Sequence, residues 1–128
     1  MEQKTHLKIN PILWGRPIEL ADGSARVELT VTKEMAADEY GLTHGGTVFG
    51  LADYAAMLAV NHPNVVLAGA KVKFLKPVQT GDVLLAKAKV EKTEGKKITV
   101  FVDVEKDAEQ VFSGEFICVI PSKHVLSK

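Results

Sequence analysis

The stretch HGGTVFGLADYAA, which begins at His44, combines two glycines and one carboxylate in an otherwise apolar segment. Gly45 and Gly46 have no Cβ, so a ligand can approach their backbone N–H groups closely. If a helix begins at these glycines, its first N–H groups have no intrahelical partner and carry partial positive charge. Such a terminus can bind an anion or the oxyanion that develops on a carbonyl. Asp53, further along the same helix, could attack that carbonyl or activate a water molecule.

Asp53 stands out because aspartate is a poor helix-interior residue and its neighbours four positions away, Phe49 and Met57, are apolar. A carboxylate on such a stripe must be solvated in a cleft, paired or functional. Structural explanations stay open at this point. A buried aspartate can cap a backbone group or pair with a lysine, and two glycines can simply form a tight turn.

The spacing between the glycines and the carboxylate favours a site shared by two chains. Seven residues with a rise of about 1.5 Å each place the backbones of Gly46 and Asp53 roughly 10 Å apart along one helix. One carbonyl carbon cannot comfortably contact both groups from that helix. We therefore expect a dimer with antiparallel helices, in which one chain provides the glycines and its partner the aspartate.

Lysines concentrate after this stretch, although the formal net charge is zero. Residues 71–97 contain eight lysines and three acidic residues. Lysines that alternate along strands usually form a solvated face, but as a group they could attract a ligand with several phosphates, such as coenzyme A. We single out Lys71, Lys73 and Lys76 as candidate contacts. The balanced charge and the lack of a basic, aromatic-rich element argue against nucleic acid or a membrane as the partner.

The elements that position these residues follow from hydrophobic periodicity. A helix is expected at about 46–61, because a segment rich in Ala, Leu and Met begins at glycines and ends at Asn61-His62-Pro63. This helix is apolar nearly all round, so we expect a second copy of the chain to cover part of it. Alternation of apolar and polar residues predicts strands at 26–31, 65–78, 83–91, 98–105 and 111–120.

Short connections such as Thr80-Gly81-Asp82 predict that consecutive strands pair antiparallel as a meander. One long helix on a curved antiparallel sheet is an α+β arrangement. Residues 1–24 contain three turn signals and are expected to form an arm or short strands. A length of 128 residues, with 46% hydrophobic and 25% charged residues, predicts a single domain over 1–128.

Metal, redox and targeting signals are weak in this chain. Cys118 is the only cysteine and lies in an apolar strand segment, which favours a core position over a nucleophile. The four histidines lack ligand spacing, so neither a metal nor another cofactor is expected. The single cysteine, the absence of a signal peptide and the lack of a long apolar span predict a cytoplasmic protein.

Taken together, these motifs resemble those of the hotdog-fold thioesterases, in particular the phenylacetate-pathway (PaaI-type) acyl-CoA thioesterases. The resemblance covers about residues 25–120. Within this range HGGTVFGLADYAA is similar to the family's His-Gly-Gly motif with a later aspartate, and KFLKPVQTGD is similar to its second motif. The resemblance implies hydrolysis of an acyl-CoA to free acid and thiol by homodimers that often form tetramers. It implies Asp53 as nucleophile or general base, Gly45 and Gly46 as oxyanion donors, and His44 as part of the carbonyl pocket.

Other positions acquire expected roles from the same resemblance. Phe49, Tyr54 and Met57 would line the acyl pocket with the partner chain, and Asn61 matches an asparagine that several relatives carry at the end of the helix. Asp38 departs from the family, because many relatives have an asparagine there and an ionised carboxylate cannot donate a hydrogen bond.

Leu67 also departs from the family pattern, since some members carry a serine or threonine of the catalytic site there. The alternative is therefore a non-catalytic acyl-CoA-binding module, similar to the hotdog domain of the fatty-acid-synthesis regulator of Gram-positive bacteria. That regulator lacks the acid that Asp53 represents. A hotdog dehydratase fits less well, because those enzymes use a histidine and an acid in a different local pattern.

Overall fold

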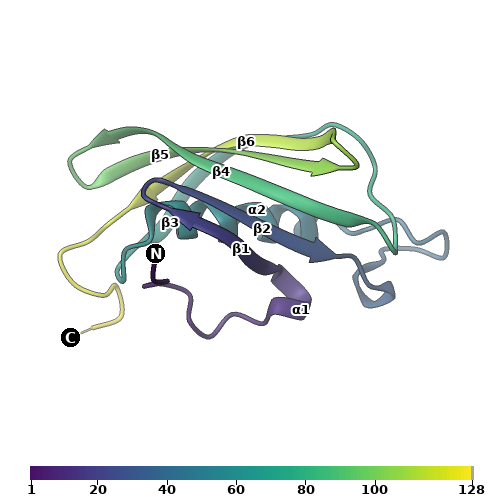
Figure 1. Cartoon of the computed structure of the whole chain (residues 1–128), viewed down its shortest axis with the longest axis horizontal. Coiled ribbons are helices and arrows are strands. Elements are labelled where there is room, and N and C mark those ends of the chain that lie inside the picture. Colours follow the sequence, from purple (N-terminus) through teal and green to yellow (C-terminus); the bar gives the residue numbers. More distant parts are fainter. Residues whose placement is uncertain (128) are drawn as a thin grey trace.

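The computed structural model describes residues 1–127 and places one long helix against the inner face of a curved antiparallel sheet (Figure 1). In chain order the elements are α1 (Pro11–Trp14), β1 (Arg16–Ala21), β2 (Ser24–Thr30), the 3-10 turn η1 (Lys33–Met35), α2 (Gly45–Val60), β3 (Val66–Phe74), β4 (Val83–Glu94), β5 (Lys97–Lys106) and β6 (Glu109–Val119). The expected α+β fold, with a central helix and a curved antiparallel sheet, is confirmed.

The helix predicted at 46–61 is confirmed as α2, which begins and ends one residue earlier. His44 precedes it in an extended conformation, and Asn61 closes it in the left-handed region with φ 49° and ψ 49°. Asparagine is among the few non-glycine residues that tolerate this conformation, which suits a helix end. The five predicted strands correspond to β2–β6, with boundaries that differ by a few residues.

The expected meander is wrong for β3. The strand order is β1-β2-β4-β5-β6-β3, so β3 pairs with β6 at the far edge instead of with β4, the next strand in the chain. The reason lies in residues 75–82, which cross the end of the sheet past the start of α2. There Thr43 donates its N–H to the Val78 carbonyl at 2.8 Å, and Thr80 donates to Gly41 at 2.9 Å.

The sheet contains a sixth strand because the expected N-terminal arm includes β1, which pairs antiparallel with β2. Inward-facing residues of the central strands are fully buried against α2, among them Val100, Val102 and Val104 of β5. Cys118 lies in this core, as its apolar neighbours predicted. No helix in the described part of the chain combines the length and hydropathy needed to cross a membrane.

The chain itself provides much of the cover for α2 that we expected from a second copy. The N-terminal segment, residues 1–15, runs along the side of the helix opposite the sheet (Figure 1). The Asn61 side chain holds this segment, because its Oδ1 accepts from the Lys4 N–H at 2.7 Å and its Nδ2 donates to the Glu2 carbonyl at 2.8 Å. The positions of α2 that stay at least partly exposed are Gly45, Gly46, Phe49, Gly50, Asp53 and Val60.

Candidate functional site

The start of α2 presents unpaired backbone donors. Among residues 1–127, no hydrogen bond engages the N–H of Gly45 or Gly46, and His44 makes no side-chain cap. The backbone here is nevertheless fixed, since His44 donates its own N–H to the Met35 carbonyl at 2.9 Å and its carbonyl accepts from the Thr47 N–H at 2.9 Å. The predicted oxyanion-binding terminus therefore has free donors on a rigid support.

A cavity of about 340 Å³ adjoins this terminus. Its lining comes from the segment before α2, the first turn of α2, the end of β3 and the crossing segment 75–82: Leu42, Thr43, Gly45, Val48, Phe74, Leu75, Lys76, Pro77, Val78 and Val111. Gly45 has a steric role, since a Cβ on it would lie 3.3 Å from Cε1 of the Phe74 ring. A mostly apolar lining beside a few polar groups is the usual character of a ligand pocket.

Asp53 lies about two turns beyond Gly46 on the partly exposed stripe of α2. Its Oδ1 is buried and has no hydrogen-bond partner within the described chain. Burial raises the pKa of Asp53 to about 6. A carboxyl group with a pKa near the working pH is suited to accept a proton in catalysis, so the environment of Asp53 fits the predicted role.

The surroundings of Asp53 place it over β6. One turn earlier on α2, the Phe49 ring packs against Phe116 with a centroid distance of 5.4 Å. Burial raises the pKa of the Cys118 thiol to about 12, with the nearby Asp53 carboxylate adding to the effect. Leu67 of β3 pairs across the strands with Cys118, so the side chain at this position is apolar and carries no hydroxyl.

Asp53 is not part of the cavity lining at Gly45. Within one chain, the free N–H groups and the carboxylate are thus separate features on the open stripe of α2. The shared site therefore stays a prediction, with the spacing along the helix as its argument.

Two predicted pocket residues, Tyr54 and Met57, are buried within the chain, and a third candidate, Asn61, has its side chain engaged by the N-terminal segment. Tyr54 is 3% exposed, and its hydroxyl accepts from Gln3 Nε2 of the N-terminal segment at 3.3 Å. Met57 is buried in the core, and the Asn61 amide is engaged by the N-terminal segment. None of the three lines the cavity of this chain.

Asp38 organises the loop before α2. Its Oδ1 accepts from the N–H groups of Tyr40 at 2.9 Å and Leu42 at 3.1 Å, a local turn-forming pattern. Aspartate and asparagine can both accept in this way through Oδ1, so the loop geometry explains a short polar side chain at this position and not the choice of an acid.

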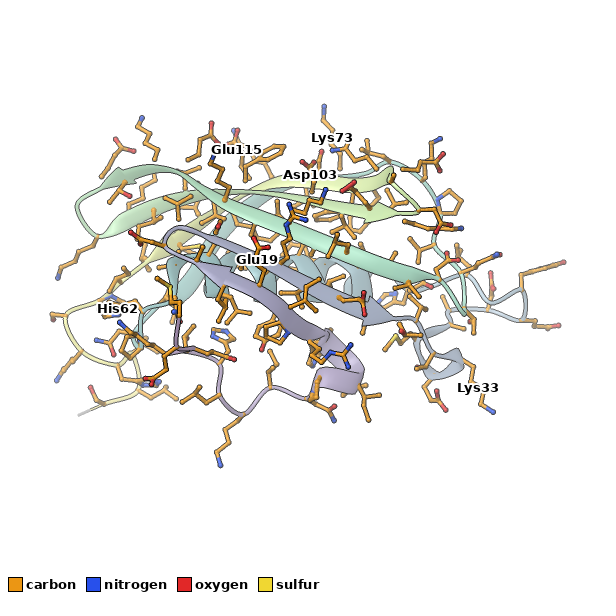
Figure 2. The ribbon with its side chains drawn as sticks, in the orientation of Figure 1. Glu19, Lys33, His62, Lys73, Asp103 and Glu115 are labelled. Atoms are coloured by element: carbon orange, nitrogen blue, oxygen red, sulfur yellow. The ribbon has the colours of Figure 1, made fainter. Side chains whose placement is uncertain are left out.

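The three candidate lysines separate in space. Lys76 lines the cavity, and its Nζ lies 3.2 Å from Glu109 Oε2. Lys73 instead projects from the outer face of the sheet, on the same side as Asp103 and Glu115 (Figure 2). Lys71 occupies the same face of β3, two residues away, and lines a shallow depression with Lys73. Only Lys76 is therefore positioned to meet a ligand in the cavity of its own chain.

Of the ten residues that line the cavity, only Gly45 and Lys76 belong to the predicted site, and the eight others, among them Thr43 and Phe74, do not. Phe74 belongs to the KFLKPVQTGD stretch, so a signal was present, but which of its residues approach α2 depends on the register of β3 with β6. Thr43 carries no comparable signal in the sequence. It is 7% exposed, and its Oγ1 has no partner within residues 1–127.

A family model of the thioesterase superfamily matches residues 40–113, which contain the glycines, Asp53 and the crossing segment. The match spans more than half of the chain, and the chain therefore belongs to the thioesterase superfamily. Within it, the sheet wrapped around α2 is the hotdog fold that the sequence motifs implied.

Curated relatives carry several names. A methylthioribose-1-phosphate isomerase of Aquifex aeolicus is 55% identical over 119 residues, which make up 93% of this chain but 26% of that protein. A putative esterase of Archaeoglobus fulgidus is 32% identical over 83% of this chain and 70% of that protein. A FapR transcription factor of Caldanaerobacter subterraneus is 28% identical over 98% of this chain and 66% of that protein. The chain thus spans only about a quarter of the isomerase.

Solved structures agree on the fold. The uncharacterized protein PH1136 from Pyrococcus horikoshii matches with a TM-score of 0.98 at 54% identity, covering 99% of this chain and 98% of that one. A mutant of the phenylacetic acid degradation protein PaaI from Thermus thermophilus matches with a TM-score of 0.79 at 25% identity, covering 85% of this chain and 95% of that one. The predicted resemblance to PaaI-type hotdog proteins is confirmed.

Proposed function

We propose that this chain is a homo-oligomeric thioesterase that hydrolyses an acyl-CoA, or a related acyl thioester, to the free acid and the thiol. The observation that carries the proposal is Asp53, a partly buried carboxylate with an unpaired oxygen and a pKa of about 6, on the helix whose first N–H groups are free. Membership of the thioesterase superfamily and the similarity to a putative esterase support it.

The chemistry follows one of two routes. As a general base, Asp53 takes a proton from water while the water oxygen attacks the thioester carbon. As a nucleophile, Asp53 attacks that carbon itself, and water then hydrolyses the resulting anhydride. In both routes the N–H groups of Gly45 and Gly46 stabilise the tetrahedral oxyanion, the C–S bond breaks, and the thiolate leaves with a proton. His44, whose imidazole lies beside Gly46, helps to shape the carbonyl pocket.

The site takes its complete form in a dimer, with Asp53 of one chain facing the glycines and cavity of its partner. The exposed glycines at the start of α2 support this arrangement, because Gly45 and Gly46 have no side chain that would keep a partner chain away. β3 supports it too, as an edge strand with one unpaired side. Two such dimers assemble into a tetramer. Lys76, at the cavity, attracts the phosphates of coenzyme A, and Lys71 and Lys73 contribute only where the assembly brings ligand to the outer face of the sheet.

The second candidate function is a non-catalytic acyl-CoA-binding module. The similarity to a FapR transcription factor over nearly the whole chain favours it, as does Leu67, which pairs with Cys118 and has no hydroxyl that could orient a water molecule. In that case Asp53 is structural and the cavity binds ligand without turnover.

Free-thiol release from short, long and aryl acyl-CoAs separates the two functions. Purified wild type is compared with Asp53→Asn and with Asp22→Asn, which alters an exposed turn carboxylate. We expect turnover to fall by about 10²–10⁴-fold in Asp53→Asn, with ligand binding by calorimetry retained and Asp22→Asn like wild type. Binding by wild type without any thiol release would instead establish the binding module.

Subunit complementation tests the shared site. Asp53→Asn and Gly46→Val are each expected to be inactive, and random mixing makes half of the dimers mixed. Each mixed dimer contains one site with both functional halves, so about a quarter of wild-type activity should return. Activity that stays at the level of the separate variants would place the complete site within one chain.

A further inference from the structure

Two buried side-chain oxygens lack a hydrogen-bond partner within residues 1–127: Asp53 Oδ1 and Thr43 Oγ1. The proposed reaction uses Asp53 but gives Thr43 no role. A buried hydroxyl without a partner destabilises the folded chain relative to an apolar group of the same shape, so its presence calls for an explanation. Thr43 lies in the wall of the cavity beside the start of α2.

The backbone of Thr43 is held firmly while its side chain is not engaged. Its N–H donates to the Val78 carbonyl at 2.8 Å, and the residue forms an isolated antiparallel bridge with Ala36. These contacts fix the Cα and Cβ positions two residues before Gly45. One staggered rotation about the Cα–Cβ bond moves Oγ1 without any change in this backbone. Oγ1 is buried in the conformation seen here, so this rotation is the movement that would bring the hydroxyl to a ligand in the cavity.

The remaining cavity wall contains few groups that could compete for that role. Val48, Phe74 and Val78 contribute apolar surface, and the ammonium of Lys76 lies 3.2 Å from Glu109. The polar groups that can fix a neutral ligand are thus the free N–H of Gly45 and the Thr43 hydroxyl. A few convergent polar groups in an apolar pocket generally set the orientation of the ligand.

We propose that the Thr43 hydroxyl is a binding residue of this site and donates a hydrogen bond to a carbonyl oxygen of the bound acyl thioester. This inference rests on the proposed function and assigns an orienting group within the same site. The carbonyl belongs either to the thioester itself or to an amide of its pantetheine arm. Both present the same acceptor to the hydroxyl, and ligand analogues separate them.

The test compares Thr43→Val, Thr43→Ser and Thr47→Val in the full chain. Valine has the shape of threonine without the hydroxyl, and serine keeps the hydroxyl. Thr47 is a matched control, because it is a buried threonine in the first turn of α2 that does not line the cavity. Dissociation constants are measured by calorimetry for coenzyme A and for thioether and ketone analogues of butanoyl-, dodecanoyl- and phenylacetyl-CoA.

We expect Thr43→Val to weaken binding about tenfold, equivalent to about 1.4 kcal/mol, while its melting temperature stays equal to or above that of wild type. Thr43→Ser should bind like wild type, and so should Thr47→Val. If the thioester carbonyl is the acceptor, only the ketone analogues, which keep that oxygen, lose affinity. If a pantetheine amide is the acceptor, coenzyme A and the thioethers lose affinity as well.

Equal affinity of Thr43→Val and wild type for every analogue overturns the inference. The inference is also overturned if the melting temperature of Thr43→Val lies well below that of wild type and ligand does not restore it. Such a loss would show that the Thr43 hydroxyl is paired within the protein. Absence of binding by wild type overturns it too. Thiol release by wild type reports the proposed function separately, and where turnover occurs, Thr43→Val should raise KM more than it lowers kcat.

Discussion

The indole ring of Trp14 packs so closely over Gly50 that a Cβ on this glycine would lie 2.3 Å from Cζ3 of the ring. Trp14 ends α1, and Gly50 lies on the partly exposed stripe of α2. This contact joins the N-terminal segment to the helix at a point one turn before Asp53. The absence of a side chain at position 50 is therefore a packing requirement within the chain.

Gly50→Ala should destabilise the protein by about 1–3 kcal/mol, the usual effect of overpacking a close contact. Alanine is otherwise the better helix former, so a loss of stability has to come from the indole ring. Urea unfolding measures the change. In a Trp14→Ala background the same substitution should be neutral or stabilising, and equal losses in both backgrounds would contradict the contact as the cause.

Stability should depend on pH through Asp53. Burial raises its pKa from 3.8 to about 6, so the folded chain holds this proton more tightly than the unfolded chain. Protonation of Asp53 therefore adds to the free energy of unfolding. This contribution is fully present below about pH 4 and is lost as the pH rises through 6. Asparagine does not ionise, so the free energy of unfolding of Asp53→Asn lacks this pH-dependent fall. Relative to wild type, the variant should therefore become more stable between pH 4 and pH 8.

The full shift corresponds to about 3 kcal/mol, and the solvent-facing part of the carboxylate reduces it to about 1–2 kcal/mol. Urea unfolding of wild type, Asp53→Asn and Asp22→Asn at both pH values gives the comparison. Asp22 is exposed, so its variant should follow wild type. If the free energies of unfolding of wild type and Asp53→Asn differ by the same amount at pH 4 and pH 8, the pKa of Asp53 is not raised by burial.

Asn61→Gly should release the N-terminal segment from α2. Glycine keeps the left-handed backbone at this position, so the substitution deletes the side-chain hydrogen bonds to Lys4 and Glu2 without strain. Hydrogen exchange at the Lys4 amide should accelerate by about tenfold, the equivalent of a 1.4 kcal/mol loss. Asn64→Ala is the control, because that side chain donates to the Pro121 carbonyl instead. Unchanged protection at Lys4 in Asn61→Gly would argue against this role.

Gly46→Ala should affect turnover far more than stability. A Cβ there would lie 2.9 Å from His44 Nε2, and this exposed imidazole can swing away. The methyl group would still stand beside the free N–H groups, and displacing the carbonyl by an ångström reduces the rate by about 10²-fold. Thiol release and thermal unfolding on one preparation separate the two effects. A large fall in melting temperature would show that Gly46 is needed for packing.

Several features of the fold could be predicted from local residue patterns. The length and limits of α2 follow from glycines at one end, Asn61 and a proline at the other, and an unbroken apolar run between them. Strand alternation identified β2–β6 because each has a buried and an exposed face. The same local reasoning singled out Asp53, since an acid on an apolar stripe is costly unless its environment explains it.

Only the tertiary structure decided which strand neighbours β3, which residues form the cavity, and which lysine reaches it. Alternation does not encode strand pairing, so the crossing of 75–82 and the separation of Lys76 from Lys71 and Lys73 could not be read from the chain. The unpaired oxygen of Thr43 depends on groups brought together from distant segments. The sequence determined the helix, the strands and the importance of Asp53, because these follow from residue patterns over a few neighbouring positions. Long-range packing decided how the helix and strands combine into a site.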